Sequence, residues 1–199
     1  MLKFRERLSK NCLPAFNLEL VYQCAERALE EELNETCSAA KCVPMSGISE
    51  RIFVGTWRDA ADEKLLRQMC ITHTLNVARE LVDTEEMHRV ESVPFVTSKS
   101  IPLSDSLDED IVHHFEDAFE FIRGATRNGR ILVYCRRGMS RSAAIVVAYL
   151  MESEGMSFCD AHNDVKDKRP CISLNLAFLQ RLQEYEEHLE KVRAAARTN

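Results

Sequence analysis

The sequence predicts an α/β protein in which a mainly parallel central sheet of about five strands is flanked by helices. Short apolar stretches alternate with amphipathic, helix-like stretches from residue 48 onward. Residues 131–134 are apolar throughout, as in a strand that is buried on both faces. Residues 142–153 are apolar on nearly every side, which is typical of a central helix. The 199 residues are enough for one ordinary domain.

The first 47 residues differ in pattern from the rest of the chain. Between about 17 and 34, apolar residues recur at helical spacing among charged residues, which predicts an amphipathic helix. We therefore assign 1–47 to a helical extension packed on the domain, 48–193 to the domain itself and 194–199 to a tail. Covering a substrate is a second interpretation of the extension, because segments beside a site often carry function.

The first half of the domain is expected to begin with a short strand at 51–54. Asp59 is suited to cap a helix that continues through Met69, because a carboxylate accepts hydrogen bonds from the free amides of a first turn. The alternating pattern at 71–77 predicts a second strand. A loop with a short strand or helical piece at 83–97 and a strand end at 100–103 are expected to follow.

The second half of the domain has clearer boundaries. Ser106 and Glu109 have the spacing of a capping box, which predicts a helix over about 107–127 and a connection ending at Gly129. Ser157 and Asp160 form a similar cap signal. The strand at 131–134 is then expected to be followed by helices over 142–153, 157–168 and 174–193.

Composition and charge narrow the class of protein. Hydrophobic residues are 45% and charged residues 29% of the chain, which is the balance of a globular rather than a disordered protein. The net charge of −6 argues against nucleic acid as the main partner. The longest apolar run, 143–151, has nine residues, so we expect no membrane span. The sequence leaves the oligomeric state open.

The eight cysteines are expected to be free thiols. The N-terminal residues have no apolar signal-peptide core, so we expect a reducing compartment, the cytoplasm, with the nucleus as an alternative. The nearest pair, Cys37 and Cys42, has no matching histidine cluster, so we expect no metal site.

The informative stretch of the sequence lies at 131–147. A buried-type strand leads to Cys135, five residues follow, and Arg141 and Ser142 open the apolar helix. In an open α/β sheet, ligands bind at the carboxyl ends of strands, where helix N-termini point outward. The spacing of Cys135 and Arg141 is weak evidence alone, but the strand, loop and helix around it make the pattern much more specific.

This loop has the residue types that a phosphate site requires. Successive backbone amides can converge on one anion, and the following helix adds its positive N-terminus. Gly138 allows a conformation or a close approach that a side chain would prevent. Arg141 can hold two phosphate oxygens, and the same positive field favours a thiolate at Cys135, which is then a nucleophile beside bound phosphate. The candidate phosphate-binding residues are Arg136, Arg137, Gly138, Met139, Ser140 and Arg141.

With these residues in view, 131–147 resembles the signature loop of the cysteine-dependent protein tyrosine phosphatase superfamily. The sequence at 140–143 and the stretch at 148–151 are similar to its dual-specificity branch, and the resemblance extends over about 50–187. The helix before residue 45 resembles the N-terminal cap helix of the small atypical dual-specificity phosphatases. The resemblance implies that 48–193 is a dual-specificity phosphatase catalytic domain that works without a metal or cofactor.

The resemblance also implies roles for residues outside the loop. A general acid is expected on a separate loop, and Asp105 takes the family position, 30 residues before Cys135. The alternatives Asp108, Glu109 and Asp110 fall in a predicted first helical turn, where acids are common for other reasons. Ser142 matches the hydroxyl that donates to the sulfur, and Asn175 matches a residue that braces the loop from a neighbouring segment.

Two positions depart from the family pattern. Tyr134 precedes the nucleophile where the family usually has histidine, and a tyrosine carries no positive charge near neutrality. We therefore expect a less readily ionised Cys135 and slower turnover. Leu174 replaces a common proline, and we expect this to affect only the entry into the last helix.

The resemblance implies phosphorylated proteins as substrates, with phosphotyrosine and phosphoserine or phosphothreonine both hydrolysed through a phosphocysteine intermediate. Two alternatives stay open. The same chemistry could act on a phosphoinositide, an RNA 5′ end or a phosphoglycan, or the protein could be a weakly active phosphate-binding pseudophosphatase. Arg130, Arg136 and Arg137 form a positive zone that either steers multiply phosphorylated substrates or is ordinary solvated surface.

Overall fold

The computed structural model describes residues 44–197, so the amphipathic helix expected at about 17–34 lies outside the described part of the chain. Every described residue lies in one unit of the chain, Ala40–Asn199.

This unit has regular structure on either side of 48–193, the range that we predicted for the domain. Its first strand lies at Ser46–Gly47, inside the segment assigned to the extension, because these residues pair with the strand that follows them. Its last helix ends at Arg197, inside the segment assigned to the tail.

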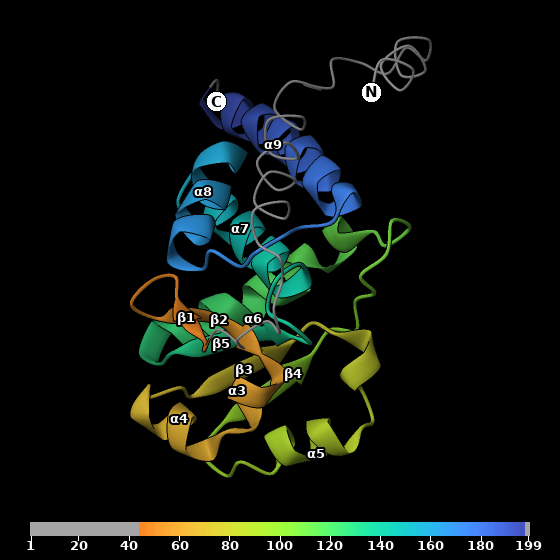
Figure 1. Ribbon diagram of the computed structural model, residues 1–199. Helices are drawn as coiled ribbons and strands as arrows, with labels where there is room; N and C mark the ends of the chain where they lie inside the picture. The colour runs from red at the N-terminus through yellow and green to blue at the C-terminus, as the bar shows by residue number, and fades with distance from the viewer. Residues whose placement is uncertain (1–43, 198–199) are drawn as a thin grey trace. The chain divides into compact units, whose positions relative to one another are not determined.

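A five-stranded sheet forms the centre of this unit (Figure 1). In spatial order the strands are β1 (Ser46–Gly47), β2 (Ile52–Thr56), β5 (Ile131–Cys135), β3 (His73–Asn76) and β4 (Thr97–Ser100). β1 runs antiparallel to β2, and the other three pairs are parallel. The predicted fold class, a mainly parallel sheet of about five strands between helices, is therefore confirmed.

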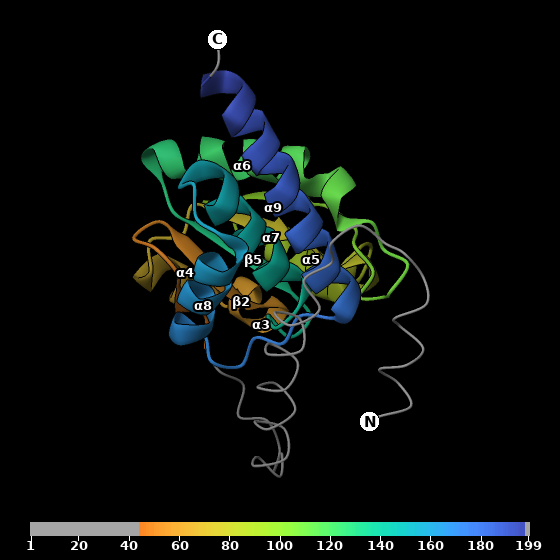
Figure 2. The ribbon, with the colours of Figure 1, turned by 90° about the horizontal axis from the view of Figure 1, so that it is seen from above.

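Helices cover both faces of the sheet. The helices are α3 (Trp57–Ala61), α4 (Glu63–Gln68), α5 (Glu85–Glu91), α6 (Phe115–Asn128), α7 (Arg141–Ser153), α8 (Phe158–Lys168) and α9 (Leu176–Arg197), with 3₁₀ turns η1 (Arg79–Leu81) and η2 (Ile111–His114). Figures 1 and 2 show α7, α8 and α9 on one side of the sheet and α3, α4 and α5 on the other. α7 packs on β2 and β5 and contacts α6, α8 and α9, so it is the central helix.

The burial of β5 and α7 follows from their sequences. All five residues of β5 are buried, as expected for a strand between two parallel neighbours. Every residue of α7 from Arg141 to Met151 is buried, which explains why no polar face is visible in this helix. The site loop between β5 and α7 is therefore held at both ends by the core.

The region expected to be one helix through Met69 consists of two short helices, so the expected cap at Asp59 is wrong. Thr56 caps α3 instead, and Asp59 sits at its third position, where its carboxylate accepts from the Thr56 amide at 2.7 Å. Asp62 then caps α4, accepting from the Leu65 amide at 3.1 Å. A second capping carboxylate within the stretch explains the break.

The capping box expected from Ser106 and Glu109 does not form. Glu109 accepts instead from the Ser104 amide at 2.8 Å, and the helical region begins five residues after Ser106, with η2. The apolar residues Ile111, Phe115, Ala118, Phe119 and Ile122 of this region are buried, and Gly129 ends α6 as expected.

Two other elements differ from the expected boundaries. The segment 83–97 contains α5, capped by the hydroxyl of Thr84, and the fourth strand lies at Thr97–Ser100 rather than extending to 103. The cap expected at Ser157 is present, because its hydroxyl accepts from the Asp160 amide at 3.1 Å.

Among residues 44–197, no helix is both long and apolar enough to cross a membrane.

Candidate active site

The sulfur of Cys135 lies at the carboxyl end of β5, with α7 beginning six residues later. The residue is buried, at 2% exposure. The backbone amide of Gly138 donates to Sγ at 3.2 Å, and the hydroxyl of Ser142 lies 3.3 Å from it. Two polar groups therefore meet at the sulfur, and both stabilise a thiolate when they donate to it.

Gly138 satisfies both conditions that the sequence suggested for it. Its φ of +66° lies in the left-handed region. A Cβ at this position would lie 2.4 Å from the carbonyl oxygen of Gly55, at the end of β2. The loop therefore depends on a close backbone approach between two glycines.

Arg169 holds this part of the loop in place, and its role there was not predictable from the sequence pattern. Its side chain is buried at 1% exposure, and Nε donates to the carbonyl oxygen of Gly138 at 2.7 Å. Nη1 donates to the carbonyl oxygen of Pro44 at 2.9 Å and to the hydroxyl of Ser46 at 3.2 Å. The arginine therefore connects the loop to the start of the sheet. It lies in a stretch that resembles the family, but an arginine's burial cannot be read from its residue type.

Arg141 is held from outside the loop by Glu80, a second residue that the sequence did not single out. Nη1 and Nη2 donate to the two carboxylate oxygens of Glu80 at 2.5 and 2.6 Å, and Nη1 also donates to the carbonyl oxygen of Leu103 at 3.1 Å. Burial alone would lower the pKa of Arg141, but the bonds to Glu80 and the charge at Cys135 raise it. The same guanidinium lowers the pKa of Glu80.

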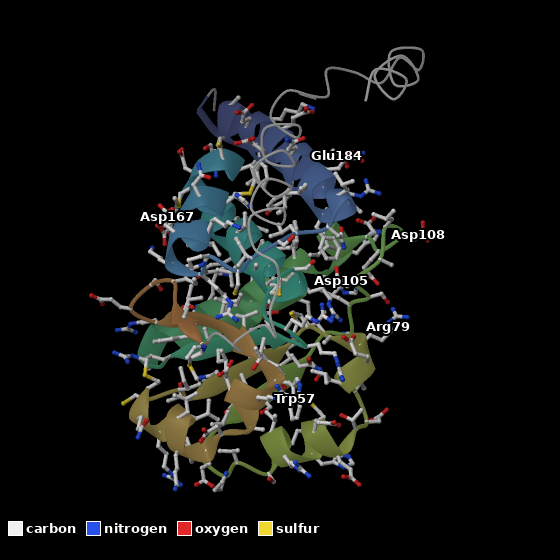
Figure 3. All side chains as sticks on the ribbon, viewed as in Figure 1. Trp57, Arg79, Asp105, Asp108, Asp167 and Glu184 are labelled. Carbon is white, nitrogen blue, oxygen red and sulfur yellow. The ribbon has the colours of Figure 1, made fainter. Side chains whose placement is uncertain are left out.

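Asp105 is the predicted acid that lies against the loop. Its Oδ1 accepts from the Ser140 hydroxyl at 2.8 Å, and its Oδ2 lies 3.8 Å from Arg141 Nε. Asp108 is exposed, and Figure 3 shows it farther out on the same segment. Glu109 bonds to the Ser104 amide. Asp110 lies within ion-pair distance of His113 and Arg181 rather than of the loop.

Asn175 contacts the acid rather than the loop. Its Nδ2 donates to Asp105 Oδ1 at 2.7 Å, and its Oδ1 accepts from the Phe178 amide at 2.9 Å near the start of α9. The direct contact between this segment and the loop is made by the Ser173 amide, which donates to the Met139 carbonyl oxygen at 3.1 Å. Asn175 therefore positions Asp105, and its link to the loop runs through that carboxylate.

Tyr134 points away from the sulfur that follows it. Adjacent side chains of a strand project to opposite faces, and the Tyr134 hydroxyl donates to Met87 Sδ in α5 at 3.4 Å. Burial raises the pKa of Tyr134, so its hydroxyl stays neutral.

Arg136 and Arg137 are exposed at the mouth of the loop. Within the described residues, no cluster of three or more acids, cysteines or histidines could hold a metal ion.

Comparisons with known proteins identify the family to which this fold belongs. The family model for the dual specificity phosphatase catalytic domain matches residues 52–188. Human dual specificity phosphatase 28 is 34% identical over 148 residues, covering 74% of this chain and 80% of that protein. A mouse protein described as a dual specificity phosphatase, solved with zinc tungstate, is 34% identical with a TM-score of 0.68, covering 80% of this chain and 96% of that one.

A longer relative matches over part of its length. Human dual specificity protein phosphatase 16 is 32% identical over 167 residues, which are 81% of this chain and 24% of that protein. The chain therefore spans about a quarter of this relative.

Proposed function

The chain belongs to the dual specificity phosphatase catalytic-domain family, and on that premise we propose that it hydrolyses phosphotyrosine and phosphoserine or phosphothreonine in proteins. The observation that carries the proposal is the sulfur of Cys135, which has the Gly138 amide and the Ser142 hydroxyl within 3.3 Å. A thiolate in this position is a nucleophile at the floor of an anion site.

The proposed reaction has two steps. In the first, the Cys135 thiolate attacks phosphorus, the bond from phosphorus to the substrate oxygen breaks, and Asp105 gives that oxygen a proton. In the second, water attacks phosphorus, Asp105 takes a proton from the water, and the sulfur leaves as a thiolate. Ser142 stabilises the departing sulfur, which its hydroxyl reaches at 3.3 Å. Arg141 holds the phosphoryl oxygens in both steps.

The charge distribution near the loop favours phosphoproteins over polyanionic substrates. The side chains of Glu80 and Asp105, both close to Arg141, are 40% and 38% exposed. These carboxylates lie beside the exposed cations Arg136 and Arg137, so the surroundings are mixed in sign. A phosphoinositide or an RNA 5′ end carries several negative charges, which carboxylates at the rim repel.

Turnover of para-nitrophenyl phosphate and of a phosphopeptide panel tests the proposal. Wild-type protein is expected to hydrolyse both, and Cys135→Ser is expected to hydrolyse neither while still binding phosphopeptide. Cys70→Ser is the matched control, because Cys70 is an exposed free thiol. Retained turnover in Cys135→Ser would exclude the covalent route.

The same assay separates the alternatives that the sequence left open. A protein that hydrolyses phosphoinositide, RNA 5′ phosphate or phosphoglycan faster than every phosphopeptide has the proposed chemistry but another substrate. A wild-type protein that binds phosphopeptides without turnover is a pseudophosphatase, and this result would overturn the proposed activity.

A further inference from the structure

Two exposed leucines lie beside the predicted general acid. Three large hydrophobic side chains are exposed in the described part of the chain: Leu107 at 70%, Leu176 at 58% and Val192 at 51%. Leu107 follows Asp105 by two residues. Leu176 directly follows Asn175, whose Nδ2 donates to Asp105 Oδ1 at 2.7 Å. We call Leu107 and Leu176 the leucine rim.

Contacts on both sides of the leucine rim hold its two segments together. On one side Asp105 bonds to Asn175, and on the other Arg181 Nε in α9 lies 3.8 Å from Asp110 Oδ1. In the sequence, one leucine lies between the two acids and the other lies between their two partners. Figures 1 and 2 show the green segment that carries the acids beside the start of α9. The two segments therefore present their leucines at the same edge of the site.

The leucine rim lies within reach of the substrate residue next to the phosphorylated one. In the proposed reaction, Asp105 gives its proton to the oxygen of the phosphorylated side chain, so its carboxylate lies against that residue. Two residues of chain span at most about 7 Å, which limits the distance between the Cα atoms of Asp105 and Leu107. Neighbouring Cα atoms of the substrate are about 3.8 Å apart. A peptide with its phosphate at Cys135 therefore brings an adjacent side chain to the rim.

We propose that the leucine rim is a specificity determinant that selects substrates with a large apolar residue next to the phosphorylated one. This proposal rests on the proposed function, and it names the class of phosphoprotein site on which that function acts. An exposed leucine is stabilised when an apolar side chain covers it, because both side chains lose contact with water. A polar side chain in the same place gives little stabilisation, because it must give up its own hydration.

The ratio of kcat/KM between matched phosphopeptides gives the first test. The peptides differ only in having leucine or serine directly before or directly after the phosphotyrosine. The wild-type chain is expected to favour leucine about 3- to 10-fold in at least one of these two positions. Leu107→Ser combined with Leu176→Ser is expected to bring this ratio below about twofold. A displaced Asp105 would instead lower turnover of both peptides alike and leave the ratio unchanged.

Val192→Ser is the matched control for this double variant. Val192 is also an exposed hydrophobic residue of α9, but it lies near the other end of that helix from Leu176. Its substitution is expected to leave the leucine-to-serine ratio at the wild-type value. Each of the three substitutions replaces an exposed side chain, so the variants are expected to fold.

A charge reversal of preference gives the second test, which a loss of stability cannot imitate. Leu107→Lys is expected to raise kcat/KM for a peptide with glutamate beside the phosphotyrosine, relative to the leucine peptide, by at least about fivefold. Val192→Lys carries the same added charge far along α9 and is expected to leave this ratio unchanged. Equal ratios in the two lysine variants would overturn the proposal.

The outcomes separate the leucine rim from the proposed function. Equal wild-type turnover of the leucine and serine peptides, or a double variant that keeps the wild-type ratio, overturns the rim and leaves the proposed function intact. If the wild-type chain hydrolyses no phosphopeptide, the proposed function fails, and the ratio is measured as dissociation constants of Cys135→Ser for fluorescent peptides. A preference for leucine that disappears with the two rim substitutions then retains the rim. Equal binding, or no binding, overturns it.

A second copy of the chain is another occupant that these variants detect. If the leucine rim were an interface between copies, the wild-type chain would sediment as a dimer and the double serine variant as a monomer. The wild-type ratio for leucine and serine peptides would then be close to one. We expect the same sedimentation for both proteins, and a change of oligomeric state with no peptide preference would overturn the proposal.

Discussion

Arg169 Nε donates a 2.7 Å hydrogen bond to the carbonyl oxygen of Gly138, which connects a side chain beyond the end of α8 to the middle of the phosphate loop. The side chain is buried, and its Nη1 bonds to Pro44 and Ser46 at the first strand. One guanidinium therefore holds both the loop and the edge of the sheet. The loop is therefore held in part by a side chain that lies outside it.

Removal of this guanidinium is expected to cost stability as well as activity. Arg169→Ala leaves the buried Gly138 carbonyl oxygen without this donor and breaks the bonds to Pro44 and Ser46, so we expect the free energy of unfolding to fall by about 2–4 kcal/mol. Urea denaturation measures this loss, with Arg127→Ala as the control, because Arg127 is exposed in the last turn of α6. Equal stability of the two variants would show that the Arg169 contacts contribute nothing.

Gly138 is expected to tolerate no side chain. Gly138→Ala places a Cβ 2.4 Å from the Gly55 carbonyl oxygen, so the loop must move and kcat/KM is expected to fall at least about 100-fold. Gly155→Ala is the control, because Gly155 also has a positive φ, +72°, but an added Cβ there meets no atom within 4 Å. This variant is expected to lose about 1–2 kcal/mol of stability and to keep its turnover. Similar activity in both variants would refute the argument from close approach.

Asp105 is expected to matter most for poor leaving groups. Asp105→Asn removes the proton that the leaving oxygen needs, so we expect turnover of a phosphothreonine peptide to fall by about 10²- to 10⁴-fold. The loss for para-nitrophenyl phosphate is expected to be smaller, because nitrophenolate leaves readily without a proton. Asp108→Asn is the control on the same segment, and a loss there as large as that in Asp105→Asn would identify the wrong acid.

His162 makes stability depend on pH in the weakly acidic range. Burial first, and the charge of Lys166 second, lower its pKa below the ordinary 6.5. As pH falls, the unfolded chain therefore binds this proton before the folded chain does. The contribution of neutral His162 to the free energy of unfolding is therefore fully present above about pH 6.5. It is lost as the pH falls toward the lower pKa of the folded state.

Urea denaturation at pH 7.5 and pH 5.5 measures this effect. One proton limits the slope to about 1.4 kcal/mol per pH unit. His162→Asn is expected to reduce the dependence, and part of it is expected to remain, because burial also lowers the pKa of His73. An unchanged pH dependence in His162→Asn would assign the effect to other groups.

The sequence predicted the fold well where patterns are local. The apolar run of β5, the all-round apolar α7 and the cap at Ser157 were readable because each depends on neighbours in the chain. The two missed caps have different causes. The cap of α3 is local, because Thr56 and Asp59 have the spacing of a capping box, but Asp59 takes the third helical position rather than the cap position. Glu109 instead accepts from the Ser104 amide five residues earlier, a contact that capping-box spacing does not predict.

The candidate site was also predictable only where its residues lie close together in the sequence. The spacing of Cys135 and Arg141 lies within one loop, so it indicated the nucleophile and the anion-binding arginine. Glu80 and Arg169 reach that loop from 61 and 31 residues away, and nothing in their own segments signals a contact. That Tyr134 leaves Cys135 less readily ionised stays a prediction, and the alternation of a strand turns the Tyr134 hydroxyl to Met87 on the other face.

The bond between Arg169 and Gly138 also sets the order in which a growing polypeptide can complete its pocket. Translation releases Cys135 well before Arg169, so the thiol emerges from the ribosome while its loop still lacks the group that holds it. Until residue 169 is free to fold back, the Gly138 carbonyl oxygen lacks the donor that joins the loop to the first strand.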